Sequence, residues 1–339
     1  MVAYGSRINK KRGFFFVSKV TGKHLPAKPS TMLNTYKDLA NLIPKSSEPT
    51  LFIGFAEAAT ALGQGVYEAY NMPHSFYMHS TRFSTSHKKW FTFLEEHSHA
   101  PNHIFYEPIN QKLKKIMEKV TRIILIDDEI STGNTANNII KELKIIFPTV
   151  KTYLLVSILD WSNRVYDNFE SLALHKGSFT FTDKRIDITD KIISEPKIIK
   201  NLDTVIPYNF ARYGIQHLNI NVEKYVNIEE IKNKKILILG TAEFMYPPYL
   251  LAQYIENKGI ECYFQATTRS PINIDGEIVS KITFIDNYFE NIDNFLYNVI
   301  DKDYDKVFIC YETKMLPQAF NLADQLRDKF DVEEIYFHV

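Results

Sequence analysis

The sequence predicts an α/β protein of two domains, each built on a parallel sheet. Short apolar runs rich in β-branched residues alternate with amphipathic stretches, which is typical of strand–helix–strand units. This alternation is interrupted by a charged, apolar-poor stretch at residues 221–235 and then resumes. The 339 residues are enough for two domains with cores of ordinary size. We therefore expect one domain over residues 1–220 and a second over 221–339.

The composition narrows the classes of function. Apolar residues make up 45% and charged residues 24%, as in globular proteins. Forty basic residues balance forty acidic ones, so nothing in the net charge favours a nucleic-acid partner. Cys262 and Cys310 lie in or beside apolar runs, which indicates buried thiols in a reducing compartment. No signal peptide or membrane-length apolar stretch is evident, so we expect a cytoplasmic protein without a membrane association.

The first domain is predicted to form a parallel sheet with a long insertion. Its expected strands cover residues 50–55, 74–80, 122–126 and 152–159, with helices over 57–70 and from about 134 onward. The insertion, residues 81–106, is polar, aromatic and rich in histidine, and long insertions of this kind are often functional flaps. His97, His99 and His103 could bind zinc, contact an anion or acceptor, or lie in a solvated loop. No carboxylate or cysteine beside them completes an obvious metal site.

The second domain is predicted to be a smaller, Rossmann-like unit. Its expected strands cover 235–240, 260–268, 306–312 and 333–339, with helices over 246–259 and 317–330. Prolines stand near the start of the first helix and Gly259 follows its end, the usual asymmetry of helix termini. The GxGxxG fingerprint is missing, so dinucleotide binding is not indicated.

The stretch "LIDDEISTGNTANN", residues 125–138, joins three acids to a loop suited to anions. Ligands of open α/β sheets bind at the carboxyl ends of strands, where this stretch is expected to lie. The hydroxyls, the glycine and the start of a helix make an anion site, because unpaired N–H groups and the helix dipole favour negative charge. The acids suit the same ligand if it also carries hydroxyls or a metal, as a ribose 5-phosphate would. A solvated acidic turn before a helix is the alternative.

This stretch resembles the phosphoribosyl diphosphate motif of type I phosphoribosyltransferases: an apolar strand, two acids, a short spacer and Thr-Gly-x-Thr. The resemblance implies a type I phosphoribosyltransferase-like sheet with a flap. It also implies that Asp127 and Asp128 hold the ribose hydroxyls and, through water, Mg²⁺, and that Glu129 orients the loop or supports the ligand. The residues that would cradle the 5-phosphate are Ser131, Thr132, Gly133, Asn134 and Thr135.

The same resemblance implies a diphosphate loop after an earlier strand, at Ala56, Glu57 and Ala58. Such loops often contain a cis peptide bond. Glu57 departs from the usual small residues: it either faces magnesium or the acceptor, or is an acid in the first turn of a helix. On the flap, Arg82 and Lys88, together with Lys89, are candidates to neutralise the departing diphosphate, and His99 is a candidate contact to the substrates.

Further stretches resemble one branch of this superfamily, associated with bacterial tellurite-resistance and stress operons. They are "FFFVSKVTGKHLP", "GFAEAATALGQGV", "HSTR" and "EEHSHAPNH". Members carry a C-terminal domain named for the peptide Thr-Arg-Ser-Pro, and "TTRSP" occupies residues 267–271 here. Thr268, Arg269 and Ser270 could clamp a phosphate or carboxylate or form a capped turn, and Lys23 could contact a phosphate.

These observations predict an enzyme that binds phosphoribosyl diphosphate with Mg²⁺ and transfers ribosyl 5-phosphate to a small nitrogenous acceptor, or runs the related reverse reaction. The alternative is a non-catalytic sensor of phosphoribosyl diphosphate. The polar flap favours catalysis, because water would compete for the reacting carbon. The acceptor stays open, and a homodimer is one option for the assembly.

Overall fold

A computed structural model describes residues 2–6, 14–94, 102–180, 206 and 208–337. Its contacts divide the chain into two compact units. We call Leu33–Thr180 with Asn209–Asn219 the N-terminal sheet unit. The C-terminal sheet unit consists of Met1–Met32, Phe181–Tyr208 and Ile220–Val339, as far as these residues are described.

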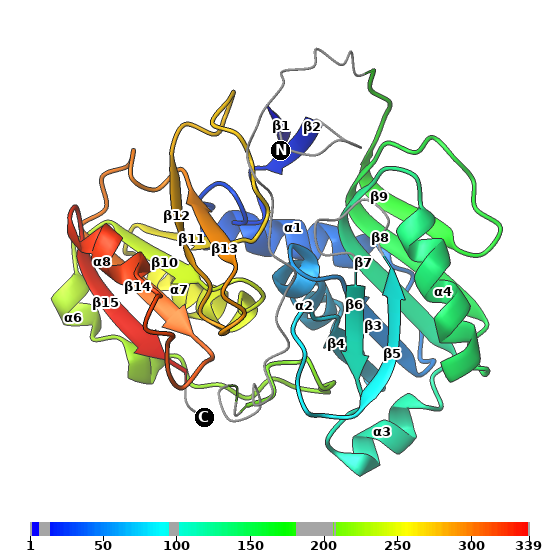
Figure 1. Ribbon diagram of the computed structural model, residues 1–339. Helices are drawn as coiled ribbons and strands as arrows, with labels where there is room; N and C mark the ends of the chain where they lie inside the picture. Colours follow the sequence, from blue (N-terminus) through cyan, green and yellow to red (C-terminus); the bar gives the residue numbers. More distant parts are fainter. Residues whose placement is uncertain (1, 7–13, 95–101, 181–205, 207, 338–339) are drawn as a thin grey trace. The chain divides into compact units, whose positions relative to one another are not determined.

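The N-terminal sheet unit is built on five parallel strands in the order β4-β3-β7-β8-β9 (Figure 1). The inner strands are buried along most of their length, as expected for a parallel sheet that is covered on both faces. The strands are β3 (Thr50–Gly54), β4 (Ser75–His79), β7 (Arg122–Ile130), β8 (Thr152–Asp160) and β9 (Glu170–Lys176). β7 runs four residues past its predicted end at 126, because Asp127, Glu129 and Ile130 still pair with β8.

Helices cover both faces of this sheet. The chain passes from β3 through α2 to β4, and from β7 through α4 to β8, so the two crossovers leave the middle of the sheet in opposite directions. Right-handed crossovers in opposite directions place their helices on opposite faces, and Figure 1 shows α2 and α4 on either side of the strands. The helices are α1 (Pro29–Leu42), which contains the boundary between the units, α2 (Ala59–Tyr70), α3 (Gln111–Met117) and α4 (Asn134–Ile146).

The predicted flap contains an antiparallel hairpin of β5 (Lys89–Leu94) and β6 (Asn102–Tyr106). Thr81 and Ile104 exchange two backbone hydrogen bonds of 2.9 Å, which tie the hairpin to the chain just after β4. On its other strand the Trp90 ring meets Phe147, next to α4, edge to face at 5.0 Å. The hairpin is therefore anchored at both strands.

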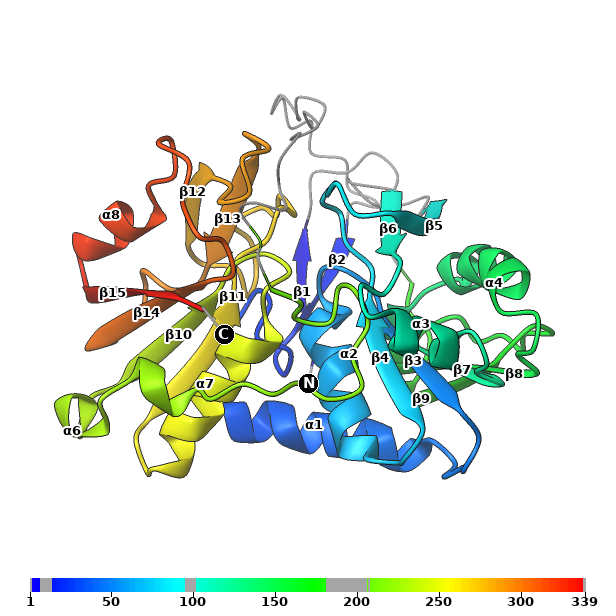
Figure 2. The ribbon, with the colours of Figure 1, turned by 90° about the horizontal axis from the view of Figure 1, so that it is seen from below.

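The C-terminal sheet unit is built on four parallel strands in the order β11-β10-β14-β15. Figure 2 shows α7 alongside β10 and β11, which it contacts. The helix predicted over 317–330 is shorter than expected, because residues 317–320 form a turn closed by the Phe320 N–H and the Pro317 carbonyl. The elements are η1 (Glu223–Tyr225), α6 (Ile228–Ile231), β10 (Ile236–Gly240), α7 (Tyr246–Asn257), β11 (Cys262–Ala266), β12 (Lys281–Ile285), β13 (Asp293–Tyr297), β14 (Lys306–Tyr311), α8 (Leu322–Arg327) and β15 (Asp331–Tyr336).

The first residues of the chain group with the C-terminal sheet unit, although the sequence suggested a single domain over 1–220. The hairpin of β1 (Val2–Ser6) and β2 (Phe14–Ser18) shares an apolar cluster with β13. Further along the chain, Ala27 and Phe264, a residue of β11, exchange backbone hydrogen bonds of 2.9 and 2.8 Å. A β-pairing between segments this far apart in sequence leaves no periodic signal, so residue patterns did not predict it.

Among the residues that the structure describes, no helix combines the length and the hydropathy that a membrane span needs.

We expect Gly65→Ala to destabilise the N-terminal sheet unit, although alanine usually stabilises a helix interior by about 1 kcal/mol relative to glycine. A Cβ at Gly65 would lie 2.5 Å from Cγ of Tyr36, at the root of a ring that is 1% exposed. Denaturant unfolding should therefore show a loss of about 2 kcal/mol in the free energy of unfolding. The double variant with Tyr36→Leu should lose less than the two single changes together. If the losses of the two single variants add up in the double variant, the predicted clash between a Cβ at position 65 and the Tyr36 ring is wrong.

Candidate active site

The loops after β3 and β7 meet at the carboxyl edge of the N-terminal sheet. The chain turns one way after β3 and the other way after β7, which makes this the topological switch point where open α/β sheets bind ligands. The Phe55 N–H donates to the Ile126 carbonyl over 3.3 Å. These two residues directly precede Ala56 and Asp127, so both predicted substrate loops start side by side.

The three acids lie at the end of β7 and are half-buried. Asp127 pairs with Ser157 and Glu129 with Leu159 in the ladder to β8, so the sheet holds the backbone that carries them. The Asp127 carboxylate accepts the Asp128 N–H at its Oδ1 over 3.0 Å. Carboxylate oxygens of this kind suit both ribose hydroxyls and Mg²⁺.

The loop "STGNT" leads from β7 into α4, as the motif predicts. Gly133 is the N-cap residue and has a φ of +77°, with no side chain capping the helix. A Cβ there would lie 2.7 Å from Cζ of Tyr166, so a side chain would fit neither the backbone angle nor the space. The Asn134 N–H meets Thr132 Oγ1 at 3.3 Å. The loop therefore presents hydroxyls and the amino end of a 13-residue helix, which suits an anion.

The predicted diphosphate loop has its Ala56–Glu57 peptide bond in the cis form. The Ala56 N–H donates to Ser80 Oγ over 2.9 Å, and the Ala56 carbonyl accepts from Arg82 Nη2 over 3.2 Å. Both polar groups of Ala56 are thus held by the segment that follows β4. Ala58 is the N-cap residue of α2, and the Glu57 carbonyl accepts from the hydroxyl of Thr60. Glu57 precedes this N-cap, so the prediction that it is an acid in the first turn of the helix is wrong. A role of its carboxylate toward magnesium or the acceptor stays a prediction.

The flap residues take different positions. Arg82 reaches the diphosphate loop through Ala56. Lys88, whose side chain is 76% exposed, pairs with Glu107 at 2.9 Å, and its role opposite a diphosphate stays a prediction. Glu107 also pairs with Lys114 at 2.9 Å, and hydrogen bonds from Lys114 and then Lys88 lower its pKa.

Of the three candidate histidines of the flap, only His103 lies among the residues that the structure describes. His97 and His99 lie outside the described residues. His103 is buried, and its Nδ1 meets Ser80 Oγ at 2.7 Å. Within the described ranges, no group of three or more His, Cys, Asp or Glu side chains is arranged to hold a metal ion.

Aromatic residues follow β8 and β9 at the same edge of the sheet, Trp161 after the first strand and Phe179 after the second. The Trp161 N–H donates to the carbonyl of Ile130, just beyond the acids of β7, over 2.8 Å. The Trp161 ring meets Phe179 edge to face at 5.9 Å, and Phe179 is 38% exposed. Nothing in the spacing of these residues marked them in the sequence, because their contact joins the ends of two different strands.

The remaining candidates lie in the C-terminal sheet unit, at its own switch point between β10 and β14. Lys23 is 3% exposed, and its Nζ donates to the carbonyls of Ala242 and Thr267 over 3.1 and 2.7 Å. In "TTRSP", Thr268 Oγ1 accepts the Ser270 N–H over 3.1 Å, which is the predicted capped turn. The Arg269 guanidinium pairs with Glu290 at 3.2 Å, so an incoming anion would have to compete with this carboxylate.

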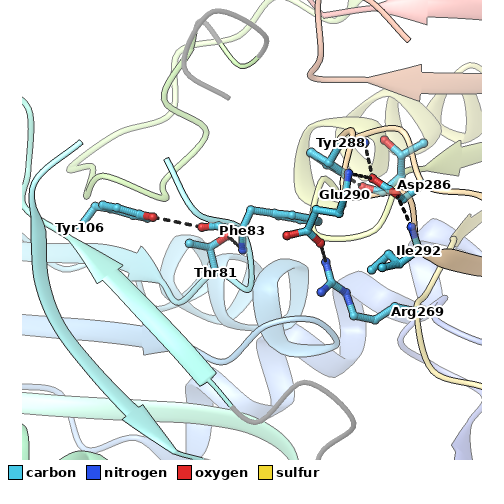
Figure 3. Close-up of polar contacts among 9 residues, drawn as sticks. Thr81, Phe83, Tyr106, Arg269, Asp286, Tyr288, Glu290 and Ile292 are labelled. Atoms are coloured by element: carbon cyan, nitrogen blue, oxygen red, sulfur yellow. Dashed lines mark hydrogen bonds and ion pairs between the residues drawn. The ribbon is translucent and has the colours of Figure 1, made fainter. Parts of the chain in front are cut away.

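The carboxylate that Arg269 meets, Glu290, lies on the same loop as a second buried acid, Asp286 (Figure 3). Asp286 accepts three backbone N–H groups, those of Tyr288, Glu290 and Ile292, which fix the loop after β12. The Tyr288 hydroxyl lies 2.8 Å from Glu312 Oε1. Burial raises the pKa of Glu290 from 4.5 to about 7; Arg269 opposes this rise, and Asp286 and Glu243 add to it. Glu243 follows β10 and Glu312 follows β14, so each of these acids comes shortly after an apolar strand, as Asp127 comes after an apolar run. An acid shortly after an apolar run is a signal that could have marked both residues in the sequence.

Five parallel strands in this order, with an acidic strand end leading into a glycine loop and a helix, define a phosphoribosyltransferase-type α/β unit. The family described as phosphoribosyl transferase matches residues 1–179, and the chain belongs to this family. The TRSP domain, described as lying C-terminal to that family's domain, matches residues 210–326. The predicted family, fold class and C-terminal TRSP domain are therefore confirmed.

Several solved structures are similar to this chain. Adenine phosphoribosyl transferase from Trypanosoma brucei, in complex with AMP, pyrophosphate and ribose-5-phosphate, is 16% identical with a TM-score of 0.35, over 53% of this chain and 85% of that one. A hypoxanthine phosphoribosyltransferase from Staphylococcus aureus is 13% identical with a TM-score of 0.29, over 47% of this chain and 79% of that one. No curated protein matches the chain.

We expect Glu290→Gln to change how stability depends on pH. The folded protein keeps a proton on Glu290 between about pH 4.5 and 7 that the unfolded chain releases, so the wild type loses stability as the pH rises through this range. Relative to the variant, its free energy of unfolding should fall by up to about 3 kcal/mol between pH 5 and 8. Urea unfolding at both pH values measures this.

The matched control is Glu277→Gln, because Glu277 belongs to the same unit and its side chain is 49% exposed. It should follow the wild type at both pH values. If the free energies of unfolding of the wild type and Glu290→Gln change equally between the two pH values, Glu290 does not keep a proton in the folded protein.

Proposed function

We propose that the chain transfers the ribosyl 5-phosphate group of phosphoribosyl diphosphate to a small nitrogenous acceptor and releases diphosphate, with Mg²⁺ bound to the donor. The observation that carries this proposal is the hydrogen bond from Phe55 to Ile126. It sets the loop at Ala56 beside the acids of β7, so one extended ligand can reach both. Membership of the phosphoribosyl transferase family supports the same reaction.

Each group of residues would serve one part of the donor. The hydroxyls and N–H groups of residues 131–135 would hold the 5-phosphate at the start of α4. Asp127 and Asp128 would accept hydrogen bonds from the ribose hydroxyls. The loop at Ala56, with Arg82 beside it, would hold the diphosphate and stabilise the charge that develops as it leaves.

Magnesium fits the acids at the end of β7. The available donors are carboxylate oxygens on half-buried side chains, and Mg²⁺ is commonly bound by one or two carboxylates together with waters and substrate phosphates. Asp127 and Asp128 would therefore hold the ion through water. When bound, the ion would neutralise charge on the diphosphate.

The acceptor would lie against the aromatic pair of Trp161, which follows β8, and Phe179, which follows β9. Trp161 and Phe179 offer flat apolar faces near the acids, and such faces suit a planar nitrogenous ring. This arrangement leaves the identity of the ring open. A role in making a nucleoside-like metabolite under tellurite or other stress is implied by the family resemblance and stays a prediction.

We expect Asp128→Asn to weaken the binding of phosphoribosyl diphosphate in the presence of Mg²⁺ by about tenfold or more, because a charge-assisted hydrogen bond is lost. Isothermal titration calorimetry measures the Kd, and diphosphate release with a panel of purine, pyrimidine and other nitrogenous bases measures turnover. Asp38→Asn is the matched control, because Asp38 is an exposed acid on α1 of the same unit.

The outcomes separate the two functions considered. Binding and release of diphosphate with at least one base support the transferase. Binding without release for any base supports a sensor of phosphoribosyl diphosphate. A wild-type chain that does not bind phosphoribosyl diphosphate would overturn both.

We expect Trp161→Ala to weaken the binding of the acceptor and to leave the binding of phosphoribosyl diphosphate unchanged. The KM for the acceptor should rise by about tenfold, since stacking on an aromatic face contributes about 1–3 kcal/mol per ring. The Kd of phosphoribosyl diphosphate should stay within twofold of the wild type. Steady-state kinetics on the base found active in the panel provide the measurement, and an unchanged KM would remove Trp161 from the acceptor site.

A further inference from the structure

A chain of two hydrogen bonds links the flap hairpin to the diphosphate loop. Ser80 Oγ accepts the Ala56 N–H over 2.9 Å and meets His103 Nδ1 at 2.7 Å. Ser80 and His103 are 0% and 1% exposed, so solvent takes no part in either bond. Ala56 belongs to the loop after β3, Ser80 follows β4, and His103 lies on β6. Three separate segments therefore meet in one line of polar atoms.

The His103 ring is held from several sides. It stacks on Phe93, its cross-strand partner on β5, with ring centres 4.4 Å apart and an angle of 12° between the planes. It also meets Phe55, the residue before Ala56, edge to face at 6.0 Å. The neighbouring residues Ile104 and Thr81 exchange backbone hydrogen bonds, which fix β6 beside the segment that carries Ser80. The ring has little freedom to turn away from Ser80.

The donor and acceptor roles at His103 depend on which ring nitrogen carries the proton. In the tautomer with its proton on Nε2, Nδ1 accepts the Ser80 proton while the Ser80 oxygen accepts the Ala56 N–H. A hydroxyl that donates a hydrogen bond also becomes a better acceptor, because such chains polarise one another. His103 thus strengthens the hold of Ser80 on Ala56 without touching the loop through its polar atoms.

We propose that His103 is a positioning residue that acts through Ser80 to set the Ala56 N–H, and with it the diphosphate loop. This inference rests on the proposed function, since it assigns diphosphate to that loop. Arg82 holds the other polar group of Ala56, but its charge is also the one expected to meet the diphosphate. Ser80 and His103 are both buried, and their proposed task is to hold this loop.

The test compares two ligands, each of which would occupy a different part of the site. Inorganic diphosphate with Mg²⁺ probes the loop at Ala56, and ribose 5-phosphate probes the residues from Asp127 to Thr135. Their Kd values are measured by calorimetry for the wild type and for three variants: His103→Phe, His103→Asn and Ser80→Ala. Phenylalanine keeps the stacking on Phe93 but has no Nδ1, whereas the Asn Oδ1 can accept from Ser80 in its place.

Tyr106→Phe is the matched control. Tyr106 lies on the same strand β6 and is 0% exposed, and its hydroxyl donates to the Phe83 carbonyl over 3.1 Å (Figure 3). The substitution removes this hydrogen bond and the one that the same hydroxyl accepts from the Thr85 N–H over 2.7 Å, without breaking the link to Ala56. Thermal unfolding of every variant shows whether each one folds.

We expect His103→Phe and Ser80→Ala to weaken the binding of Mg²⁺-diphosphate by about five- to tenfold, the usual effect of losing one buried hydrogen bond. Ribose 5-phosphate should bind within twofold of the wild type in both. His103→Asn should restore most of the diphosphate affinity, and Tyr106→Phe should change neither Kd. If His103→Phe does not fold, the smaller change Ser80→Ala carries the same expectation.

Other outcomes overturn the inference. Unchanged diphosphate binding in His103→Phe and Ser80→Ala, with a wild type that binds both ligands, would remove the positioning role and leave the proposed function standing. Equal losses for the two ligands would show a general structural role. A wild type that binds neither ligand would overturn the proposed function and the positioning role with it.

Discussion

The candidate site depends on the parallel pairing of β3 with β7 in the middle of one buried sheet. Its last hydrogen bond, from Phe55 to Ile126, lies where the two chains diverge toward opposite faces. In a parallel pair whose crossovers run in opposite directions, the two following loops stay adjacent while their helices move apart. The acids, the glycine loop and the cis peptide of the diphosphate loop are therefore neighbours by topology, without requiring a contact between their own side chains.

The C-terminal sheet unit uses the same geometry with a different charge pattern. Its switch point lies between β10 and β14, and there Arg269 is paired with the buried carboxylate of Glu290. Burying an acid in such surroundings raises its pKa, as it does for Glu290. Anion binding by "TTRSP" stays a prediction, and it would require a phosphate or carboxylate to displace a buried ion pair. Acids with a perturbed pKa are found more often at functional sites than elsewhere.

Much of the candidate site could be predicted because its signals are local. "RIILIDDEISTGNT" places acids, hydroxyls and a glycine within a single strand-to-helix turn, and both the turn and the +77° φ of Gly133 are present. The link from His103 to Ser80 could not be predicted in this way, although both residues stood in stretches that drew attention. The two residues are 23 positions apart in the sequence, and they meet because the hairpin pairs with the chain just after β4. No periodicity in the sequence predicts that pairing.

By itself, the sequence determined the fold class, the strand and helix types and the identity of the phosphoribosyl transferase motif, because hydrophobic periodicity and turn chemistry act over a few residues. Only the tertiary structure decided which residues lie next to Ala56, where Lys23 and Arg269 find their partners, and that residues 1–32 pack with the C-terminal sheet unit. The physical reason is that these contacts join segments far apart along the chain. Their stability comes from burial and from hydrogen bonds that exist only once the sheets have formed.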